Sequence, residues 1–69
     1  MFLNILRKLR KKKGLSQQTL ANILNVSVKS VSAWETGRRY PRHHMMQKIE
    51  DYFGVSKESI FFGAFNYKK

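Results

Sequence analysis

The residues of this chain best suited to chemistry are its lysines and arginines, and most of them lie in the first 42 residues. That part holds ten Lys and Arg side chains against one acid, Glu35, and so has a net charge of +9. Residues 43–69 hold four bases against three acids, a net charge of +1. A basic surface confined to one part of a small domain predicts binding to a polyanion such as nucleic acid. The alternative is a solvated basic face that only keeps the protein soluble.

Catalytic and metal-binding patterns are absent from the sequence. It has no nucleophile–base pair, glycine-rich phosphate loop or paired carboxylates, and a chain of 69 residues supports only a small core. His43 and His44 are adjacent, so on a helix they point apart and cannot chelate one ion together; we expect both to be exposed. With no cysteine, the chain forms neither disulfides nor a cysteine-based metal site. We therefore expect no enzyme, no cofactor and no metal.

Membrane association is also not expected. No apolar run approaches the roughly 18–20 residues that span a bilayer. The N-terminus places apolar residues before basic ones, the reverse of a secretory signal peptide. A basic amphipathic first helix can lie on an anionic membrane, but here the following helices offer its apolar stripe a folded partner. We expect a cytoplasmic protein with no membrane partner, which the lack of cysteine permits.

Five short helices are expected to position the basic residues, because apolar residues recur at helical spacing and no strand-like alternation occurs. The first four span about residues 4–13, 17–24, 28–36 and 41–52. A fifth, capped by Ser56, carries Ile60, Phe61 and Phe62. We assign residues 1–63 to one domain, and residues 64–69 to a C-terminal tail that is either frayed or forms a dimer.

Residues 16–36 have the pattern of two helices joined by a tight turn. Ser16 and Ser27 can each cap a helix by accepting from backbone N–H groups. Ala21 is small where two steeply crossing helices leave little room, and Asn25 tolerates a left-handed bend. Apolar residues recur at helical spacing in both helices: Leu20, Ile23, Leu24, Val31 and Trp34. The pattern predicts the helix-turn-helix by which many domains bind DNA.

With these residues in view, the chain resembles the phage-repressor and Cro-like (XRE) family of helix-turn-helix DNA-binding domains. The resemblance covers about residues 3–63 and is most specific in LRKKKGLSQQTLANILNVS, VSAWETGRRYP and YFGVSKESIFFG. It implies an all-α, compact, five-helix domain like that of lambda repressor. It also implies binding to double-stranded DNA, often as a symmetric dimer.

The resemblance assigns base reading to the outward positions of the third helix, which are Val28, Lys29, Ser32 and Ala33. Lys29 can donate to guanine and Ser32 to several acceptors, whereas Val28 and Ala33 offer only apolar contact with thymine methyl groups. The set holds no Arg, Asn or Gln. We therefore expect modest direct readout, with part of the specificity coming from DNA shape.

Contacts to the DNA backbone are implied at three places. Ser16 and Gln17 match a phosphate clamp at the start of the second helix, where free N–H groups favour an anion. Ser27 and Ser30 lie near enough to reach phosphates, although Ser27 can equally act only as a cap. The loop after the third helix matches a second backbone contact through Gly37, Arg38 and Arg39, with Arg42 at the minor groove. Tyr40 either stacks on the backbone or covers the core, and we favour the core.

Arg10 and Glu35 match an internal ion pair of the family, so we predict a structural role for both. Glu35 is the sole acid of the basic half, which makes an internal pair more plausible than a surface one. The alternative is that Arg10 joins Lys11, Lys12 and Lys13 in a phosphate-facing run.

The expected function is that of a small transcriptional regulator, first of all a repressor, from a bacterium or phage. One recognition helix covers few base pairs, so we expect a homodimer on a pseudo-palindromic operator. The candidate dimer surface is Phe61, Phe62, Phe65 and Tyr67, with at least one of the first two closing the core. Two alternatives stay open: an antitoxin-type protein that binds a protein partner through its C-terminal aromatics, and a general nucleic-acid or RNA binder.

Overall fold

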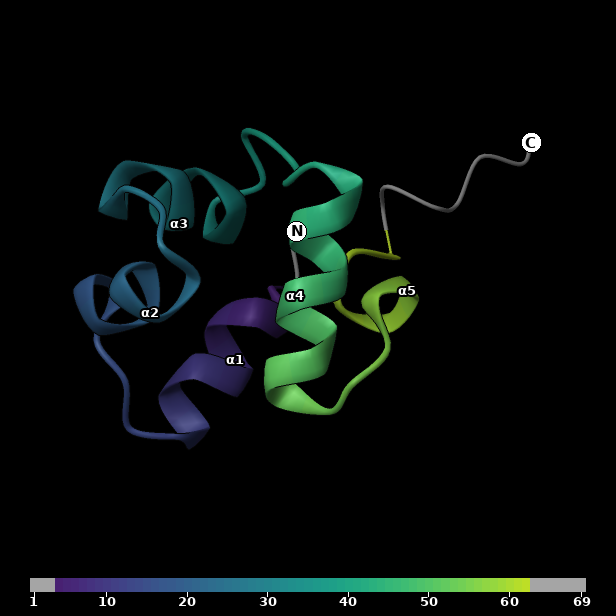
Figure 1. Cartoon of the computed structure of the whole chain (residues 1–69), viewed down its shortest axis with the longest axis horizontal. Coiled ribbons are helices and arrows are strands. Elements are labelled where there is room, and N and C mark those ends of the chain that lie inside the picture. The colour runs from purple at the N-terminus through teal and green to yellow at the C-terminus, as the bar shows by residue number, and fades with distance from the viewer. Residues whose placement is uncertain (1–3, 63–69) are drawn as a thin grey trace.

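The structure, a computed structural model, describes residues 4–62 and folds them into five α-helices joined by short loops (Figure 1). The helices are α1 (Ile5–Lys12), α2 (Gln17–Leu24), α3 (Val28–Glu35), α4 (His43–Phe53) and α5 (Lys57–Ile60). No strand occurs between residues 4 and 62, so the predicted all-α, five-helix architecture is confirmed. Residues 1–3 and the predicted tail, with Phe65 and Tyr67, lie outside the described residues.

Local side-chain caps set most of the helix starts. Asn4, Ser16, Ser27 and Ser56 each accept a hydrogen bond from the backbone N–H three residues on, satisfying a group that the helix leaves unpaired. Asn25 ends α2 in the left-handed region, with φ of 61°. The predicted bounds of α2 are therefore met. The predicted start of α4 at Pro41 is two residues early, because Arg42 is the residue that precedes its first turn.

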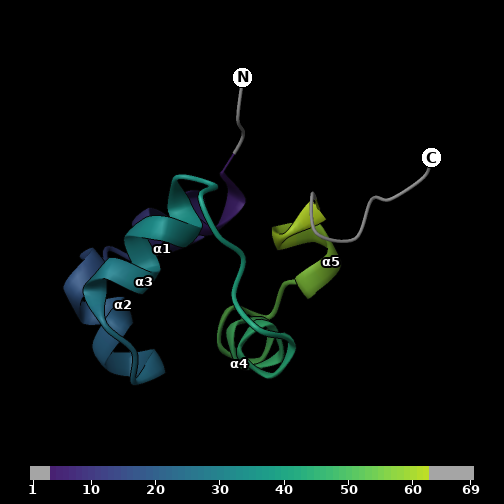
Figure 2. The same cartoon turned by 90° about the horizontal axis from the view of Figure 1, so that it is seen from above.

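The core lies between two groups of helices, with α1, α2 and α3 on one side and α4 and α5 on the other (Figure 2). Its least exposed large side chains come from the first four helices: Leu6, Leu20, Leu24, Val31 and Ile49. Ala21 is also fully buried, and Ile60 and Phe61 close the core from the α5 side. Ile23, expected in the apolar stripe of α2, is 39% exposed, so α2 buries a narrower face than predicted.

Glu50 joins α4 to the start of α5. Its Oε1 accepts from the backbone N–H of Lys57 at 2.9 Å and lies 3.4 Å from the Lys57 ammonium. The hydrogen bond from that N–H, helped by the ammonium, holds the pKa of Glu50 below its usual value of 4.5. A lowered pKa in the folded state means that the ionised carboxylate stabilises the fold above the usual pKa.

We expect the Glu50→Gln variant to be less stable than wild type at neutral pH, with the difference shrinking as the pH falls through the lowered pKa of Glu50. Protonation in acid makes the wild-type side chain neutral like that of glutamine, which removes the advantage. Urea unfolding of both proteins between pH 7 and pH 3 measures this. A stability difference that does not change with pH would contradict the assignment.

Candidate nucleic-acid interface

One face of α3 carries the predicted base-reading residues, and the structure does not present them equally. Lys29 is exposed, Ser32 is half-buried, and Val28 is half-buried and packs against the core. A shallow hollow of about 520 Å³ is lined by Lys29 and Ser32 together with Ala33, Arg38 and Arg39. Lys29 is therefore the most open residue of the predicted set, and Ser32 lies beside it in the hollow.

Ala33 corrects the sequence-based expectation. It is only 6% exposed, so its methyl group offers almost no surface to a base pair. The turn that follows α3 folds back toward it, and the backbone N–H groups of Arg38 and Arg39 donate to the Ala33 carbonyl at 3.0 and 3.4 Å. Ala33 forms part of the wall of the hollow, and its prediction as a base reader is wrong.

The same turn brings two arginines beside α3. Gly37 has φ of 77°, in the left-handed region where glycine carries no steric penalty, and it lets the chain reverse at the end of α3. Arg38 and Arg39 are both exposed, and both line the hollow that Lys29 lines. Three basic residues thus lie around one open concave surface, which favours an anion there.

A second hollow of about 430 Å³ continues from α3 to the start of α4. Arg39 lines both hollows, and the second one adds Arg42 and His44 as further basic groups. Its remaining lining residues are Val26, Ser30, Trp34, Tyr40 and Met45. Tyr40 is 46% exposed and lines the second hollow with Trp34. Arg42 and His44 are exposed, as expected for His44.

The starts of α2 and α3 lie at exposed serines. Ser16 accepts from the Thr19 backbone N–H at 3.0 Å, and Ser27 accepts from that of Ser30 at 3.2 Å. The capping role foreseen for Ser27 is thus present. The Ser27 and Ser30 hydroxyls also lie 3.1 Å apart. Ser27 is exposed and Ser30 is half-buried.

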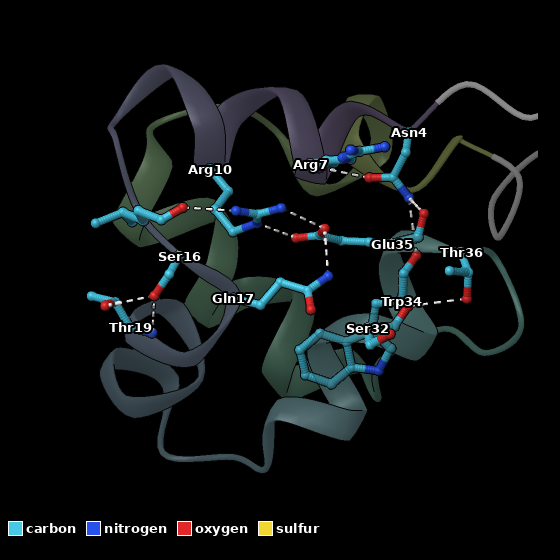
Figure 3. Close-up of polar contacts among 11 residues, drawn as sticks. Asn4, Arg7, Arg10, Ser16, Gln17, Thr19, Ser32, Trp34, Glu35 and Thr36 are labelled. Carbon is cyan, nitrogen blue, oxygen red and sulfur yellow. Dashed lines mark hydrogen bonds and ion pairs between the residues drawn. The ribbon is translucent and has the colours of Figure 1, made fainter.

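Gln17 points inward rather than toward solvent (Figure 3). Its Nε2 donates to Glu35 Oε1 at 3.1 Å, and the residue is half-buried. An amide nitrogen carries two N–H donors, so this contact engages one of them. The sequence pattern predicted an outward phosphate contact and gave no sign of this inward bond.

The predicted pair of Arg10 and Glu35 is present inside the domain (Figure 3). Arg10 Nε lies 2.6 Å from Glu35 Oε2 and Nη2 lies 3.0 Å from Oε1, so the contact is bidentate. The side chains are 9% and 2% exposed, and Arg10 Nη1 also donates to the Leu15 carbonyl at 2.7 Å. The hydrogen bonds to Glu35 raise the pKa of Arg10 above its usual value. Because Arg10 is buried, its alternative placement in a phosphate-facing run is wrong.

Two side chains near the site, those of Asn4 and Lys48, make contacts that the sequence did not predict. Asn4 reaches from the start of α1 to the end of α3, where its amide donates to the carbonyls of Trp34, at 3.1 Å, and of Glu35. Lys48 of α4 donates to the carbonyl of Leu24 at 2.9 Å, at the negative end of α2. The only sequence signal at Asn4 was its preference for helix starts, which says nothing about a partner 30 residues away.

The aromatic residues at the end of α5 divide into two classes. Phe61 is 4% exposed and belongs to the core, as expected for at least one of Phe61 and Phe62, and its burial removes it from the candidate dimer surface. Phe62 is 63% exposed and offers an apolar ring to solvent. The other two predicted dimer residues, Phe65 and Tyr67, are outside the described part of the chain.

None of the helices between residues 4 and 62 is both long and apolar enough to cross a bilayer. Nor do three or more His, Cys, Asp or Glu side chains gather there as a set of metal ligands.

Comparisons with known proteins agree with this geometry. Residues 6–60 match the model of a family described as helix-turn-helix. The chain is 36% identical over 58 residues to the HTH-type transcriptional activator BcrR of Enterococcus faecalis, in an alignment covering 84% of this chain and 28% of that protein. It is 34% identical over 68 residues to the uncharacterized HTH-type transcriptional regulator YqaE of Bacillus subtilis (strain 168), covering 99% and 59%. The chain therefore spans less than two thirds of the length of either relative.

Proposed function

The chain belongs to the helix-turn-helix family of the phage-repressor and Cro-like (XRE) type, and we propose that it binds duplex DNA sequence-specifically with α3 in the major groove. The observation that carries this proposal is the open hollow in which Lys29 and Ser32 of α3 meet Arg38 and Arg39. A single α-helix fits the width of the major groove. Flanking arginines then lie where the phosphates of the groove edge pass.

The proposed contacts separate base reading from backbone binding. Lys29 and Ser32 read base edges, with Val28 adding apolar contact. Arg42 reaches the minor groove from the second hollow, where a narrow groove has an enhanced negative potential. The phosphate contacts come from both ends of the helix-turn-helix: Ser16, Gln17, Ser27, Ser30, Gly37, Arg38 and Arg39. The second N–H of Gln17 is the donor available for a phosphate.

Regulation of transcription is the proposed use of this binding, as the names of the two relatives suggest. A bound domain occludes its site, so repression is the outcome we favour, and the protein would act in the cytoplasm. A homodimer would place two recognition helices about 34 Å apart on a pseudo-palindrome. Phe62 supports such a dimer because its exposed ring offers an apolar contact to a second copy or to another protein.

Selection from a pool of random duplex DNA tests the proposal. Wild type is expected to recover an inverted repeat with half-sites about one helical turn, or 10–10.5 base pairs, apart. Recovery of single half-sites would contradict the proposed dimer. Equal binding to every duplex at one salt concentration would favour the general nucleic-acid binder instead.

The variants Lys29→Ala and Arg38→Ala form a matched pair for that selection, because each removes one exposed cation from the same hollow. Lys29→Ala is expected to change the preferred bases, since its ammonium donates to a base edge. Arg38→Ala is expected to weaken all duplexes nearly alike, since a phosphate contact carries no sequence information. An unchanged preference in Lys29→Ala would refute its role as a base reader.

A further inference from the structure

We infer that Asn4 is a positioning residue for the DNA contact, because its amide holds the C-terminal turn of α3 in place. Through that turn it fixes Arg38 and Arg39 beside Lys29. The consequence for DNA rests on the proposed function, whereas the effect on the turn can be measured without DNA.

Asn4 uses both ends of its side-chain amide to join two helices (Figure 3). Its Oδ1 accepts from the backbone N–H of Arg7 at 2.6 Å and so caps α1. Its Nδ2 donates one N–H to the Trp34 carbonyl at 3.1 Å and the other to the Glu35 carbonyl. One side chain therefore connects the first residues of α1 to the last residues of α3.

The end of α3 needs such donors, because the last four carbonyls of a helix have no partner within it. Those of Ser32 and Ala33 accept from the backbone of the following residues, and that of Trp34 accepts from Gly37 N at 3.3 Å. For the Glu35 carbonyl, Asn4 is the donor that the described part of the chain supplies. Without Asn4, the last carbonyl of the recognition helix depends on water.

The same turn positions the arginines. The backbone N–H groups of Arg38 and Arg39 bond to the Ala33 carbonyl, so the start of the loop is fastened to the last turn of α3. Any loosening of that turn displaces both guanidinium groups relative to Lys29. Asn4 lines neither hollow, and its hydrogen bonds reach α3 only at the backbone carbonyls of Trp34 and Glu35, so its effect on DNA would pass through the turn.

Two substitutions separate the two tasks of Asn4. Asn4→Ser keeps an oxygen that can cap α1 but removes both donors to α3. Asn4→Asp also keeps the cap, and its charge favours the N-terminus of α1. The same charge repels the two carbonyl oxygens at the negative end of α3. If the turn after α3 loosens in the Asp variant, the cause must therefore be the lost contact with α3 and not a lost cap of α1. Ser56→Ala is the matched control, because it removes the cap of α5 away from α3.

The first measurement is amide hydrogen exchange by NMR on the free, full chain. We expect the Arg38 N–H to exchange about tenfold faster in Asn4→Ser, the effect of losing one net hydrogen bond, and faster still in Asn4→Asp. In Ser56→Ala it is expected to stay at the wild-type rate. Unchanged exchange at Arg38 in both Asn4 variants, or equal acceleration in Ser56→Ala, would overturn the inference.

The second measurement is affinity for the selected duplex at a temperature where all the proteins are folded. Asn4→Ser is expected to bind about tenfold more weakly and with a salt slope smaller by about one phosphate, while Ser56→Ala binds like wild type. Faster exchange without weaker binding would overturn the DNA part of the inference. If wild type binds no duplex, the proposed function fails, and the exchange rates still decide whether Asn4 holds the turn.

Discussion

The Glu35→Leu variant is expected to lose about 3–5 kcal/mol of unfolding free energy, because it leaves the guanidinium of Arg10 buried without a counter-charge. In the folded protein this arginine side chain is 9% exposed and makes a bidentate contact with Glu35. The core of so small a domain rarely supplies more than about 3–5 kcal/mol. The variant is therefore expected to be largely unfolded at 25 °C, as circular dichroism with urea unfolding would show.

The control is the double variant Arg10→Met/Glu35→Leu, which removes both charges together. Replacing a buried pair by apolar residues of similar volume is often neutral or stabilising, so the double variant is expected to recover most of the loss. Full recovery is not expected, because Arg10 also donates to the Leu15 carbonyl and Gln17 donates to Glu35. A double variant less stable than Glu35→Leu would contradict this account.

Affinity for the selected duplex is expected to fall about 10³-fold between 50 and 200 mM salt, as for a protein that neutralises about six phosphates. Each neutralised phosphate releases condensed counterions, and the free energy gained from this release falls as the salt concentration rises. The exposed cations of the two hollows, Lys29, Arg38, Arg39 and Arg42, supply much of this charge. Fluorescence anisotropy with a labelled duplex across a salt series gives the slope.

A matched pair of charge-removing variants checks which face binds. Arg39→Gln removes a cation that lines both hollows, and the slope is expected to become shallower by about one phosphate. Lys57→Gln removes a cation that bonds to Gln47 and Glu50 between α4 and α5, so the slope is expected to stay at the wild-type value. Equal changes in the two variants would contradict the placement of the interface on α3 and its following loop.

Features of the helix-turn-helix that depend on nearby residues could be predicted from the sequence. The caps at Ser16 and Ser27 act on a backbone N–H three residues away, and the left-handed Asn25 is a property of one residue. Such interactions depend on order along the chain, so the bounds of α2 followed from residue types alone. The Arg10–Glu35 pair joins residues 25 apart, and it was predicted because the family pattern records that contact.

Features that depend on how helices and turns pack together were missed or wrongly predicted. Phe61 and Phe62 have the same side chain and adjacent positions, yet one is buried and the other exposed, because the direction of α5 against the core separates them. The family resemblance implied an outward position for Ala33, yet this residue is only 6% exposed. Nothing close to Gln17 in the sequence indicates that its amide faces Glu35.

The sequence by itself determined five helices, a capped helix-turn-helix and a concentration of positive charge in its first 42 residues, because these depend on residue type and local spacing. Only the tertiary structure decided that Lys29, Ser32, Arg38 and Arg39 share one hollow, and that Asn4 donates to the last carbonyls of α3. The physical reason is distance along the chain. Contacts between residues far apart in sequence form only once the core has set the positions of the helices.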